Sequence, residues 1–287
     1  MTIVAIVGAS GATAPIGDGR NDAELLAPVV DDALTRAGVT RDDIGIVCSA
    51  GSEFLNGVVG GVMGAFDAFP GWPPRAHSHL EGDGAFALHE AWLRLLAGEA
   101  DCALVCAWSR PLATEPRRVL DLQLDPYLVA PLAPRPVDLA GLQAAGAFTA
   151  LPVSAGAAAV VLAVDRPGAV VAGVEQRADS HHLGARELTR SPSTAAAAVA
   201  LGLPGSQVDV LEVHAPFSHQ AQLVVDALAA DIDAVRLAHS DPIMVTGLLR
   251  VVAAANAVLD GGAQRVVAHA TNGPCLQHNL LCLLETQ

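Results

Sequence analysis

The fold is decided by residues 79–108, which read HLEGDGAFALHEAWLRLLAGEADCALVCAW. Gly82 and Gly84 allow a sharp turn, and apolar residues then recur at helical spacing as far as Gly98, which ends the helix. The apolar run 102–108 has the length and composition of a strand covered on both faces. We therefore expect a strand, a tight turn, a helix and a second strand, with the positive end of the helix directed at residues 81–83.

The same unit occurs twice along the chain. Residues 37–47 align without gaps on residues 201–211. Gly84 and Gly247 begin two apolar segments of equal length and pattern. The distance along the sequence between these two glycines differs by one residue from the offset between 37–47 and 201–211. Two such similar separations predict a duplicated α/β unit, in which each copy has a mixed, mostly parallel sheet and buried helices.

Hydrophobic periodicity and turn residues place the remaining elements. Residues 8–19 are expected to form a glycine-rich loop, and Pro15 forbids the helix that a dinucleotide-binding turn would need there. The expected strands lie at 2–7, 44–49, 75–80, 153–164, 169–174, 208–213, 265–270 and 280–284, and the expected helices at 22–37, 54–66, 193–201, 219–230 and 244–259.

The chain divides into three parts on this pattern. Residues 110–152 contain seven prolines and no long period, and are expected to form an irregular insertion. The N-terminal half then comprises residues 1–109 and 153–167, and the C-terminal half comprises residues 168–287.

Composition excludes several classes of function. All sixteen basic residues are arginine, which rules out lysine Schiff bases and the phosphate-binding lysine of P-loop hydrolases. The formal charge of −14 argues against nucleic acid and anionic membranes as partners. No apolar run reaches the roughly 18 residues of a membrane span, and no signal peptide is visible, so we expect a cytoplasmic protein with reduced cysteines.

The order of elements and three motifs resemble the thiolase superfamily over nearly the whole chain. The match is to the sterol-carrier-protein type of thiolase and to thiolase-like lipid-transfer proteins. Residues 212–217, EVHAPF, resemble the family motif Glu-Val-His-Asp-x-Phe. Residues 241–247, DPIMVTG, occupy the family's Gly-His-Pro loop, and residues 273–279, GPCLQHN, follow its last active-site turn.

This resemblance implies a thiolase-like fold with α-β-α-β-α layers and a shortened loop domain. It also implies a coenzyme A thioester as substrate or ligand, with no tightly bound cofactor. The active site is degenerate by comparison with the family. The nucleophilic cysteine is replaced by Glu81, the loop histidine by Asp241, and the second cysteine by Ala270 or Thr271, so that only His214 remains.

Five residues are candidate catalytic groups: His214, Glu81, Asp83, Asp241 and Cys275. His214 could orient a water or a thioester oxygen, as its family counterpart does, or it could be structural. The three acidic residues, Glu81, Asp83 and Asp241, could act as bases, but capping of helix N-termini is the favoured interpretation for all three. Cys275 could be a displaced nucleophile or a packing residue.

No metal site is predicted. His77 and His79 alternate on a predicted strand without a third ligand. The pair His181 and His182 lies in a polar loop without evident partners and is expected on the surface.

Three functions remain open at this point. The chain could be a subunit of a heteromeric acyl-CoA-processing complex in lipid or steroid-type metabolism, together with a thiolase homologue or an OB-fold acyl-CoA-binding protein. It could be a retro-aldolase of β-hydroxyacyl-CoA, although its one tyrosine, Tyr127, lies away from the motifs. It could also be a non-enzymatic acyl-CoA or lipid carrier. We expect a homo- or hetero-oligomer, with residues 75–80 pairing across the interface.

Overall fold

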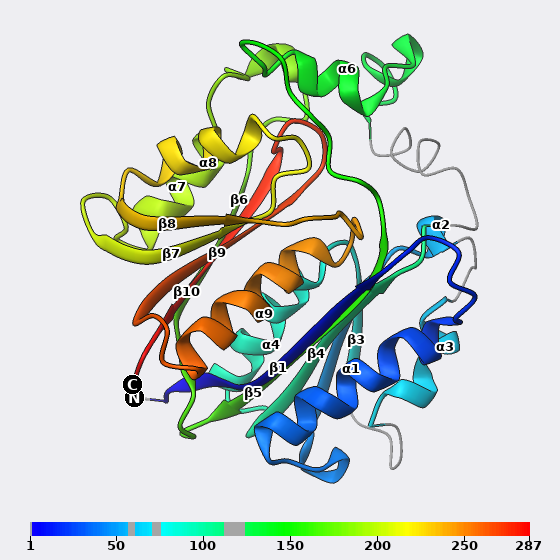
Figure 1. The fold of residues 1–287 in the computed structure, drawn as a ribbon, viewed down its shortest axis with the longest axis vertical. Coiled ribbons are helices and arrows are strands. Elements are labelled where there is room, and N and C mark those ends of the chain that lie inside the picture. The colour runs from blue at the N-terminus through cyan, green and yellow to red at the C-terminus, as the bar shows by residue number, and fades with distance from the viewer. Residues whose placement is uncertain (1, 57–60, 71–75, 112–123) are drawn as a thin grey trace.

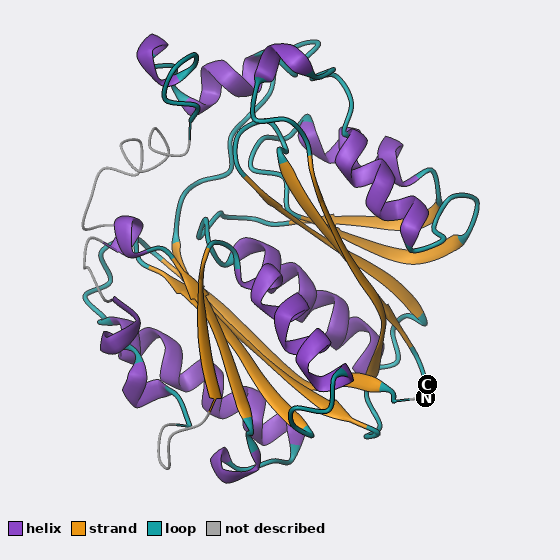
Figure 2. Cartoon of the chain, turned by 180° about the vertical axis from the view of Figure 1, so that it is seen from behind, coloured by secondary structure: helices purple, strands orange, loops and turns teal. Residues whose placement is uncertain are grey.

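The computed structural model describes residues 2–56, 61–70, 76–111 and 124–287. Helices and sheet alternate in five layers (Figure 1). Helix α1 (Asp22–Ala37) covers the first half of the sheet on the outside, and helices α7 (Pro192–Ala200) and α8 (Gln220–Leu228) cover the second half. Helices α4 (Gly84–Leu96) and α9 (Thr246–Leu259) form the middle layer, as Figure 2 shows from behind.

The ten strands have the order β3-β2-β4-β5-β1-β6-β10-β9-β7-β8. The second half therefore repeats the order of the first in reverse, as two copies related by a pseudo-twofold axis require. Within the sheet, the halves are joined where β1 pairs with β6, at Ala5 with Val170 and Ile6 with Ala169. The strands are β1 (Val4–Ala14), β2 (Ile46–Gly51), β3 (Ala76–Glu81), β4 (Cys102–Ser109), β5 (Ala155–Val164), β6 (Ala169–Ala178), β7 (Gln207–Val213), β8 (Asp231–Leu237), β9 (Arg265–Asn272) and β10 (His278–Glu285).

The sheet is mixed, but the expectation that it is mostly parallel was wrong. Strand β2 is parallel to β3 and β4, and β7 is parallel to β8 and β9. The other neighbouring pairs of the described sheet are antiparallel. The reason is that β9 returns directly into β10, and the insertion returns β4 into β5, without the helical crossover that a parallel pair needs.

The duplication extends to individual contacts. A Cβ atom added at Gly84 would lie 2.6 Å from the Cβ of Ala107, and one added at Gly247 would overlap the Cβ of Ala270. Ala107 and Ala270 have the same separation in the sequence as the two glycines. The first turn of each central helix therefore contains a glycine, because its backbone lies directly against the corresponding strand, β4 or β9.

Three clusters of buried apolar residues hold the layers together. The largest lies between the two sheet halves and includes Leu88 and Leu95 of α4 and Leu248 and Val251 of α9. The second packs α1 on the first half of the sheet, and the third packs α7 and α8 on the second half. The apolar stripe that predicted α4 thus faces the middle of the molecule, where both copies contribute to one core.

Two expectations in the N-terminal half were wrong. Strand β1 continues to Ala14, so residues 8–14 are not a loop. Their small side chains allow α1 to approach the strand, and a Cβ atom at Gly8 would overlap the backbone of Ala33. The expected helix at 54–66 is replaced by two short helices, α2 (Glu53–Asn56) and α3 (Gly61–Gly64), with residues 57–60 outside the described part.

Strand β8 was not expected from the sequence. It is an edge strand in which most side chains are exposed, and it carries no continuous apolar run. In the described part of the insertion, the helical elements are the short segments η3 (Ala130–Leu132) and α6 (Pro136–Gly141). No helix among the described residues is both long enough and apolar enough to cross a membrane.

Candidate functional site

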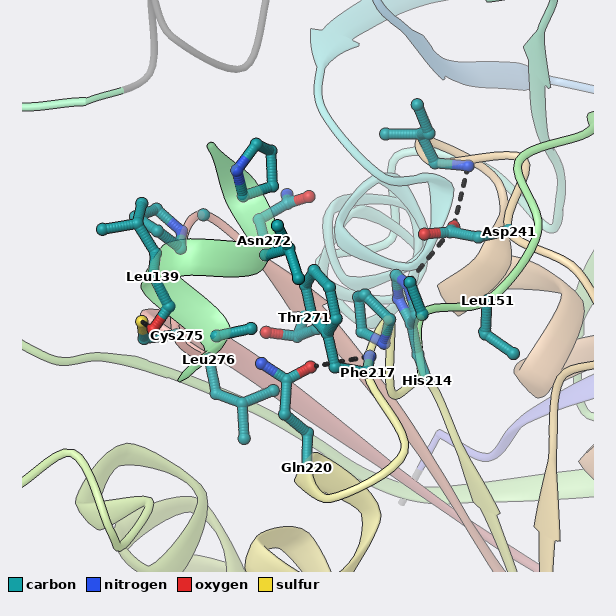
Figure 3. Close-up of a pocket in the computed structure, with 18 of the residues that line it drawn as sticks. Leu139, Leu151, His214, Phe217, Gln220, Asp241, Thr271, Asn272, Cys275 and Leu276 are labelled. Atoms are coloured by element: carbon teal, nitrogen blue, oxygen red, sulfur yellow. Dashed lines mark hydrogen bonds and ion pairs between the residues drawn. The ribbon is translucent and has the colours of Figure 1, made fainter. Parts of the chain in front are cut away.

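A cavity of about 410 Å³ lies between the insertion and the loops at the ends of β7 and β9 (Figure 3). This volume is in the range of small-molecule sites. The insertion contributes residues around α6 together with Ala150 and Leu151, Val153 follows directly after it, and residues 214–276 contribute three loops. The wall is largely apolar and includes Leu124, Leu139, Leu151, Phe217, Met244 and Leu276.

His214 provides a polar end to this cavity. It follows the last residue of β7, and its backbone N–H donates to the carbonyl of His269 at 3.2 Å. The side chain is 3% exposed, and neither ring nitrogen has a hydrogen-bond partner among the described residues. Buried polar groups are normally satisfied, so this imidazole is available to a bound molecule.

Asp241 lies beside His214, with its Oδ1 atom 3.6 Å from Nε2 of the ring (Figure 3). The same oxygen accepts hydrogen bonds from the Thr246 hydroxyl at 2.6 Å and from the Ile243 N–H at 2.9 Å. Burial by itself would raise the pKa of Asp241, but His214, Thr246 and the Ile243 N–H hold it below its ordinary value. An ionised carboxylate therefore faces the imidazole from a fixed position.

Thr271 is a polar cavity residue that was not among the five candidates. Its Oγ1 atom is buried and has no hydrogen-bond partner among the described residues. Alignment on the family placed the second cysteine at Ala270 or Thr271, which was the signal that could have identified it. Ala270 lies against Gly247 at the start of α9, whereas Thr271 lines the cavity.

Strained backbone also concentrates here. Ile243, Cys275 and Leu276 have φ angles of 48°, 57° and 53°, and all three line the cavity. Left-handed conformations of non-glycine residues cost about 1–3 kcal/mol each and persist only where the surroundings impose them. For Ile243, which is branched at Cβ, the conformation is especially unfavourable.

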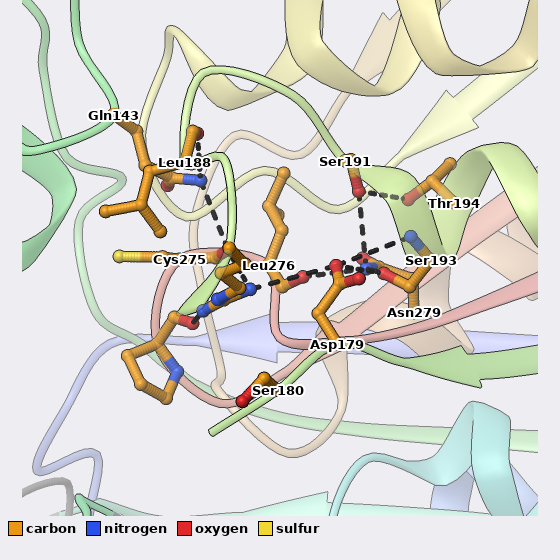
Figure 4. A network of polar contacts seen from close by, with 12 residues as sticks. Gln143, Asp179, Ser180, Leu188, Ser191, Ser193, Thr194, Cys275, Leu276 and Asn279 are labelled. Atoms are coloured by element: carbon orange, nitrogen blue, oxygen red, sulfur yellow. Dashed lines mark hydrogen bonds and ion pairs between the residues drawn. The ribbon is translucent and has the colours of Figure 1, made fainter. Parts of the chain in front are cut away.

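A network of polar side chains imposes the conformation of the turn between β9 and β10 (Figure 4). The carbonyl of Cys275 accepts hydrogen bonds from the side chains of Gln143 and Arg186, both at 3.1 Å. The amide nitrogen of Asn279 donates to the Leu276 carbonyl at 2.8 Å and to Ser193 Oγ at 2.7 Å. The turn is thus tied both to the insertion and to α7.

Asp83 does not line the cavity. It is fully buried, and its carboxylate accepts backbone N–H groups from Ala85 at 2.8 Å, Gly247 at 2.7 Å and Leu248 at 3.1 Å. Burial raises its pKa, against the opposing influence of His214 and of these N–H donors. The geometry is that of a cap for both central helices.

Asp241 does not cap α9 in the expected way. The first N–H groups of that helix are taken by Asp83, and Asp241 instead accepts from Ile243 and Thr246 in the turn before it. The carboxylate is therefore a neighbour of His214 and a turn cap, rather than the cap of the helix N-terminus.

Glu81, at the end of β3, lies outside the main cavity. Its side chain accepts the backbone N–H of Glu53 at 3.2 Å, and the residue borders a second cavity of about 220 Å³ together with Gln277 and His278. The two cavities share the wall residues Met244, Asn272 and Gly273. The structure thus separates Glu81 from the pair His214 and Asp241.

Cys275 lines the main cavity as a neutral thiol. Its Sγ atom donates to the Leu139 carbonyl at 3.3 Å, and the residue packs with Leu124 and Leu139. Burial raises the pKa of this thiol to about 11, against the influence of Arg186. A thiol in this state is a poor nucleophile at neutral pH, because the thiolate is the reactive form.

The remaining histidines singled out in the sequence have defined partners. His77 and His79 both bond to the Ser49 hydroxyl, through Nε2 at 2.9 Å and Nδ1 at 2.8 Å. The expectation that His181 and His182 lie without partners was wrong. Asp125, from the insertion, is 3.4 Å from the first and 3.8 Å from the second.

Comparison with solved structures identifies the fold. Human mitochondrial 3-ketoacyl-CoA thiolase, in complex with CoA, matches with a TM-score of 0.71 at 13% identity, covering 99% of this chain and 98% of that chain. The Ltp2-ChsH2(DUF35) aldolase matches with a TM-score of 0.72 at 13% identity, covering 99% and 98%. No family model and no curated protein matches the sequence. The chain therefore has the thiolase fold, as its motifs predicted.

Proposed function

We propose that this protein binds acyl-CoA thioesters, without cysteine-based thiolysis, as a subunit of a heteromeric acyl-CoA-processing complex. The observation that carries the proposal is the apolar cavity that ends at the imidazole of His214, whose ring nitrogens form no hydrogen bond with the described residues. The apolar wall suits an acyl chain, in keeping with a role in lipid or steroid-type metabolism. One thiolase with this fold is in complex with CoA, which supports the same class of ligand.

His214 and Thr271 are the groups that would meet the thioester. Both present buried polar atoms at the cavity that form no hydrogen bond with the described part of the chain, and each can donate a hydrogen bond to the thioester oxygen. A proton on Nε2 would face Asp241, so a proton on Nδ1 is the one that could be donated to a ligand oxygen. Such donors stabilise negative charge that develops on an oxygen during thioester chemistry.

Thiolysis itself needs an acyl group held on a cysteine thiolate. The position of that cysteine is occupied by Glu81, which borders the other cavity, and Cys275 is protonated at neutral pH. We therefore expect the isolated chain to leave acetoacetyl-CoA and free CoA unchanged. Turnover with an acetyl adduct that disappears in Cys275→Ala would contradict this part of the proposal.

A partner would supply what this chain lacks. Strand β3 is one edge of the sheet, and such an edge presents unpaired backbone groups that favour association with another chain. A thiolase homologue, or an OB-fold acyl-CoA-binding protein, is the proposed partner. The Ltp2-ChsH2(DUF35) aldolase, whose name joins two proteins, supports a heteromeric arrangement. Light scattering of the purified protein tests for an oligomer, and a stable monomer at micromolar concentration would argue against homo-oligomers.

The insertion 110–152 is proposed as a shortened loop domain that interrupts the N-terminal half, 1–109 plus 153–167. The C-terminal half is residues 168–287. The described part of the insertion forms one wall of the cavity through α6, Ala150 and Leu151. A short loop domain leaves few groups for the nucleotide part of CoA, so the acyl chain should dominate the affinity.

Binding measurements test this directly. Isothermal titration with octanoyl-CoA, acetyl-CoA and free CoA should give an affinity that rises with the acyl chain. Leu151 lines the cavity, and Leu151→Trp should weaken octanoyl-CoA at least about tenfold by filling that space. Leu142 is 57% exposed and lies outside the cavity wall, so Leu142→Trp is the matched control. Equal affinity for octanoyl-CoA and free CoA would remove the basis of the proposal.

Retro-aldol cleavage of a β-hydroxyacyl-CoA is the second candidate function, and the pairing of His214 with Asp241 favours it. His214 would accept the hydroxyl proton while the Cα–Cβ bond breaks, releasing a carbonyl product. The electron pair would pass to a thioester enolate, whose oxygen Thr271 would bond and whose Cα would then be protonated. Detection of the carbonyl product, and its loss in His214→Gln, would distinguish this enzyme from a non-enzymatic acyl-CoA or lipid carrier.

A further inference from the structure

Asp125, His181 and His182 form the one cluster among the described residues in which three metal-capable side chains converge. Their ligand atoms all lie within 4.8 Å of one another. Asp125 comes from the insertion, whereas the histidines follow β6, in the other half of the chain. The spacing of the sequence therefore gives no indication of the cluster, which the tertiary structure alone assembles.

The two carboxylate oxygens of Asp125 have different roles. Oδ1 accepts the backbone N–H groups of Tyr127 at 2.9 Å and Leu128 at 2.6 Å. Oδ2 faces the histidines, at 3.4 Å from Nε2 of His181 and 3.8 Å from Nδ1 of His182.

Both histidines present a ring nitrogen to Asp125, Nε2 in His181 and Nδ1 in His182. Nδ1 of His182 is buried and has no hydrogen-bond partner among the described residues. The rings of His181 and His182 lie against each other, with centroids 4.0 Å apart, so both point toward the same carboxylate. Two ligands at zinc–nitrogen and zinc–oxygen distances of about 2.1 Å in tetrahedral geometry are about 3.4 Å apart, which is close to the separations observed.

We propose that Asp125, His181 and His182 bind a divalent transition-metal ion, with Zn²⁺ the best fit to two imidazoles and one carboxylate. The side chains of His181 and His182 are 58% and 45% exposed, which leaves a path for the ion to enter. Three protein ligands leave the fourth tetrahedral position to water.

By binding Asp125 together with His181 and His182, the ion would link the insertion to the loop after β6, beside the cavity. Leu124, next to Asp125, lines the cavity wall. Leu183, next to His182, packs against the same apolar cluster of Leu124, Leu139 and Cys275. Metal binding therefore stabilises the position of this wall, and this role does not depend on which ligand the cavity takes.

Isothermal titration of Zn²⁺ into the full-length, tag-free protein, after chelator treatment and dialysis, tests the site. We expect one ion per chain, and a loss of affinity of at least about tenfold in both Asp125→Asn and His182→Ala. The asparagine keeps an Oδ1 acceptor for Tyr127 and Leu128, so the turn should be retained. His239→Ala, at an exposed histidine outside the cluster, is the matched control and should bind as the parent protein does.

Two further measurements separate the site from general metal adsorption. Co²⁺ should give the visible absorption bands of a tetrahedral complex in the parent protein and in His239→Ala, but not in His182→Ala. The thermal midpoint should rise with Zn²⁺ in the first two proteins only. Lack of saturable one-to-one binding, or unchanged affinity in both Asp125→Asn and His182→Ala, would overturn the proposal.

Discussion

The carboxylate of Asp83 accepts the backbone N–H of Gly247, from the other copy of the repeated unit, at 2.7 Å. Through this contact and the N–H groups of Ala85 and Leu248, one side chain caps the N-termini of α4 and α9 together. The pseudo-symmetric position in the second half holds Thr246, whose hydroxyl donates to Asp241 instead. The two central helices therefore share one cap, Asp83. Thr246, at the equivalent position in the second copy, instead donates to Asp241 beside the cavity.

Asp83→Ala should destabilise the protein more than removal of an ordinary helix cap. Loss of one N-cap costs about 1 kcal/mol, and two helices lose theirs here, so we expect a decrease of about 2–4 kcal/mol in the free energy of unfolding. Urea denaturation measures it. Asn21→Ala, which removes the cap of α1 alone, is the comparison, and an equal effect of the two substitutions would contradict the shared cap.

Gly84→Ala and Gly247→Ala should both reduce stability, because each new methyl group meets a packed layer. The added Cβ at Gly84 lies 2.6 Å from that of Ala107, and the one at Gly247 overlaps both Ala270 and Asp83. Overpacking of this kind costs about 1–3 kcal/mol, with the larger effect expected at Gly247. Gly146 has nothing within 4 Å of an added Cβ, so Gly146→Ala should be nearly neutral in the same denaturation experiment.

His269 should make stability depend on pH. Burial lowers its pKa from 6.5 to about 4, against the hydrogen bond between its Nε2 and Asn279 Oδ1. The folded state favours the neutral ring. The contribution of His269 to the free energy of unfolding is therefore fully present above pH 6.5 and is lost as the pH falls to about 4. Its size is about 3 kcal/mol.

The variant His269→Gln, which can still donate to Asn279, isolates this effect. Free energies of unfolding measured from pH 7 to pH 4 should fall less steeply in the variant than in the parent protein. Parallel curves for the two proteins would show that His269 titrates normally in the folded state.

Cys275 should resist alkylation in the native protein. A rise in its thiol pKa from 9.0 to about 11 reduces the thiolate about a hundredfold at neutral pH, and the hydrogen bond to Leu139 holds the thiol in the wall. Intact-mass analysis after iodoacetamide treatment should show little native adduct, and five adducts in denaturant, one for each cysteine. A single fast native adduct that maps to Cys275 would make it a candidate nucleophile again.

Long periodic segments were predictable because their physical signals are local. The spacing of apolar residues predicted the helices that begin at Asp22 and Gly84 and the buried strand that begins at Cys102. It also showed that the Gly84 segment recurs at Gly247. Strand β8 and residues 8–14 gave no such signal, since this edge strand is mostly exposed and a run of glycine and alanine has low strand propensity.

The sequence by itself thus determined the duplicated α/β fold and placed His214 and Asp241 at loop positions near the site. Only the tertiary structure decided that these two side chains lie next to each other. It also decided that Asp83 caps two helices and that Glu81 lies at a separate cavity. It alone also brought Asp125 to His181 and His182. The physical reason is that periodicity reports which face of an element is buried, whereas the partner of a polar group depends on contacts between segments far apart in the chain.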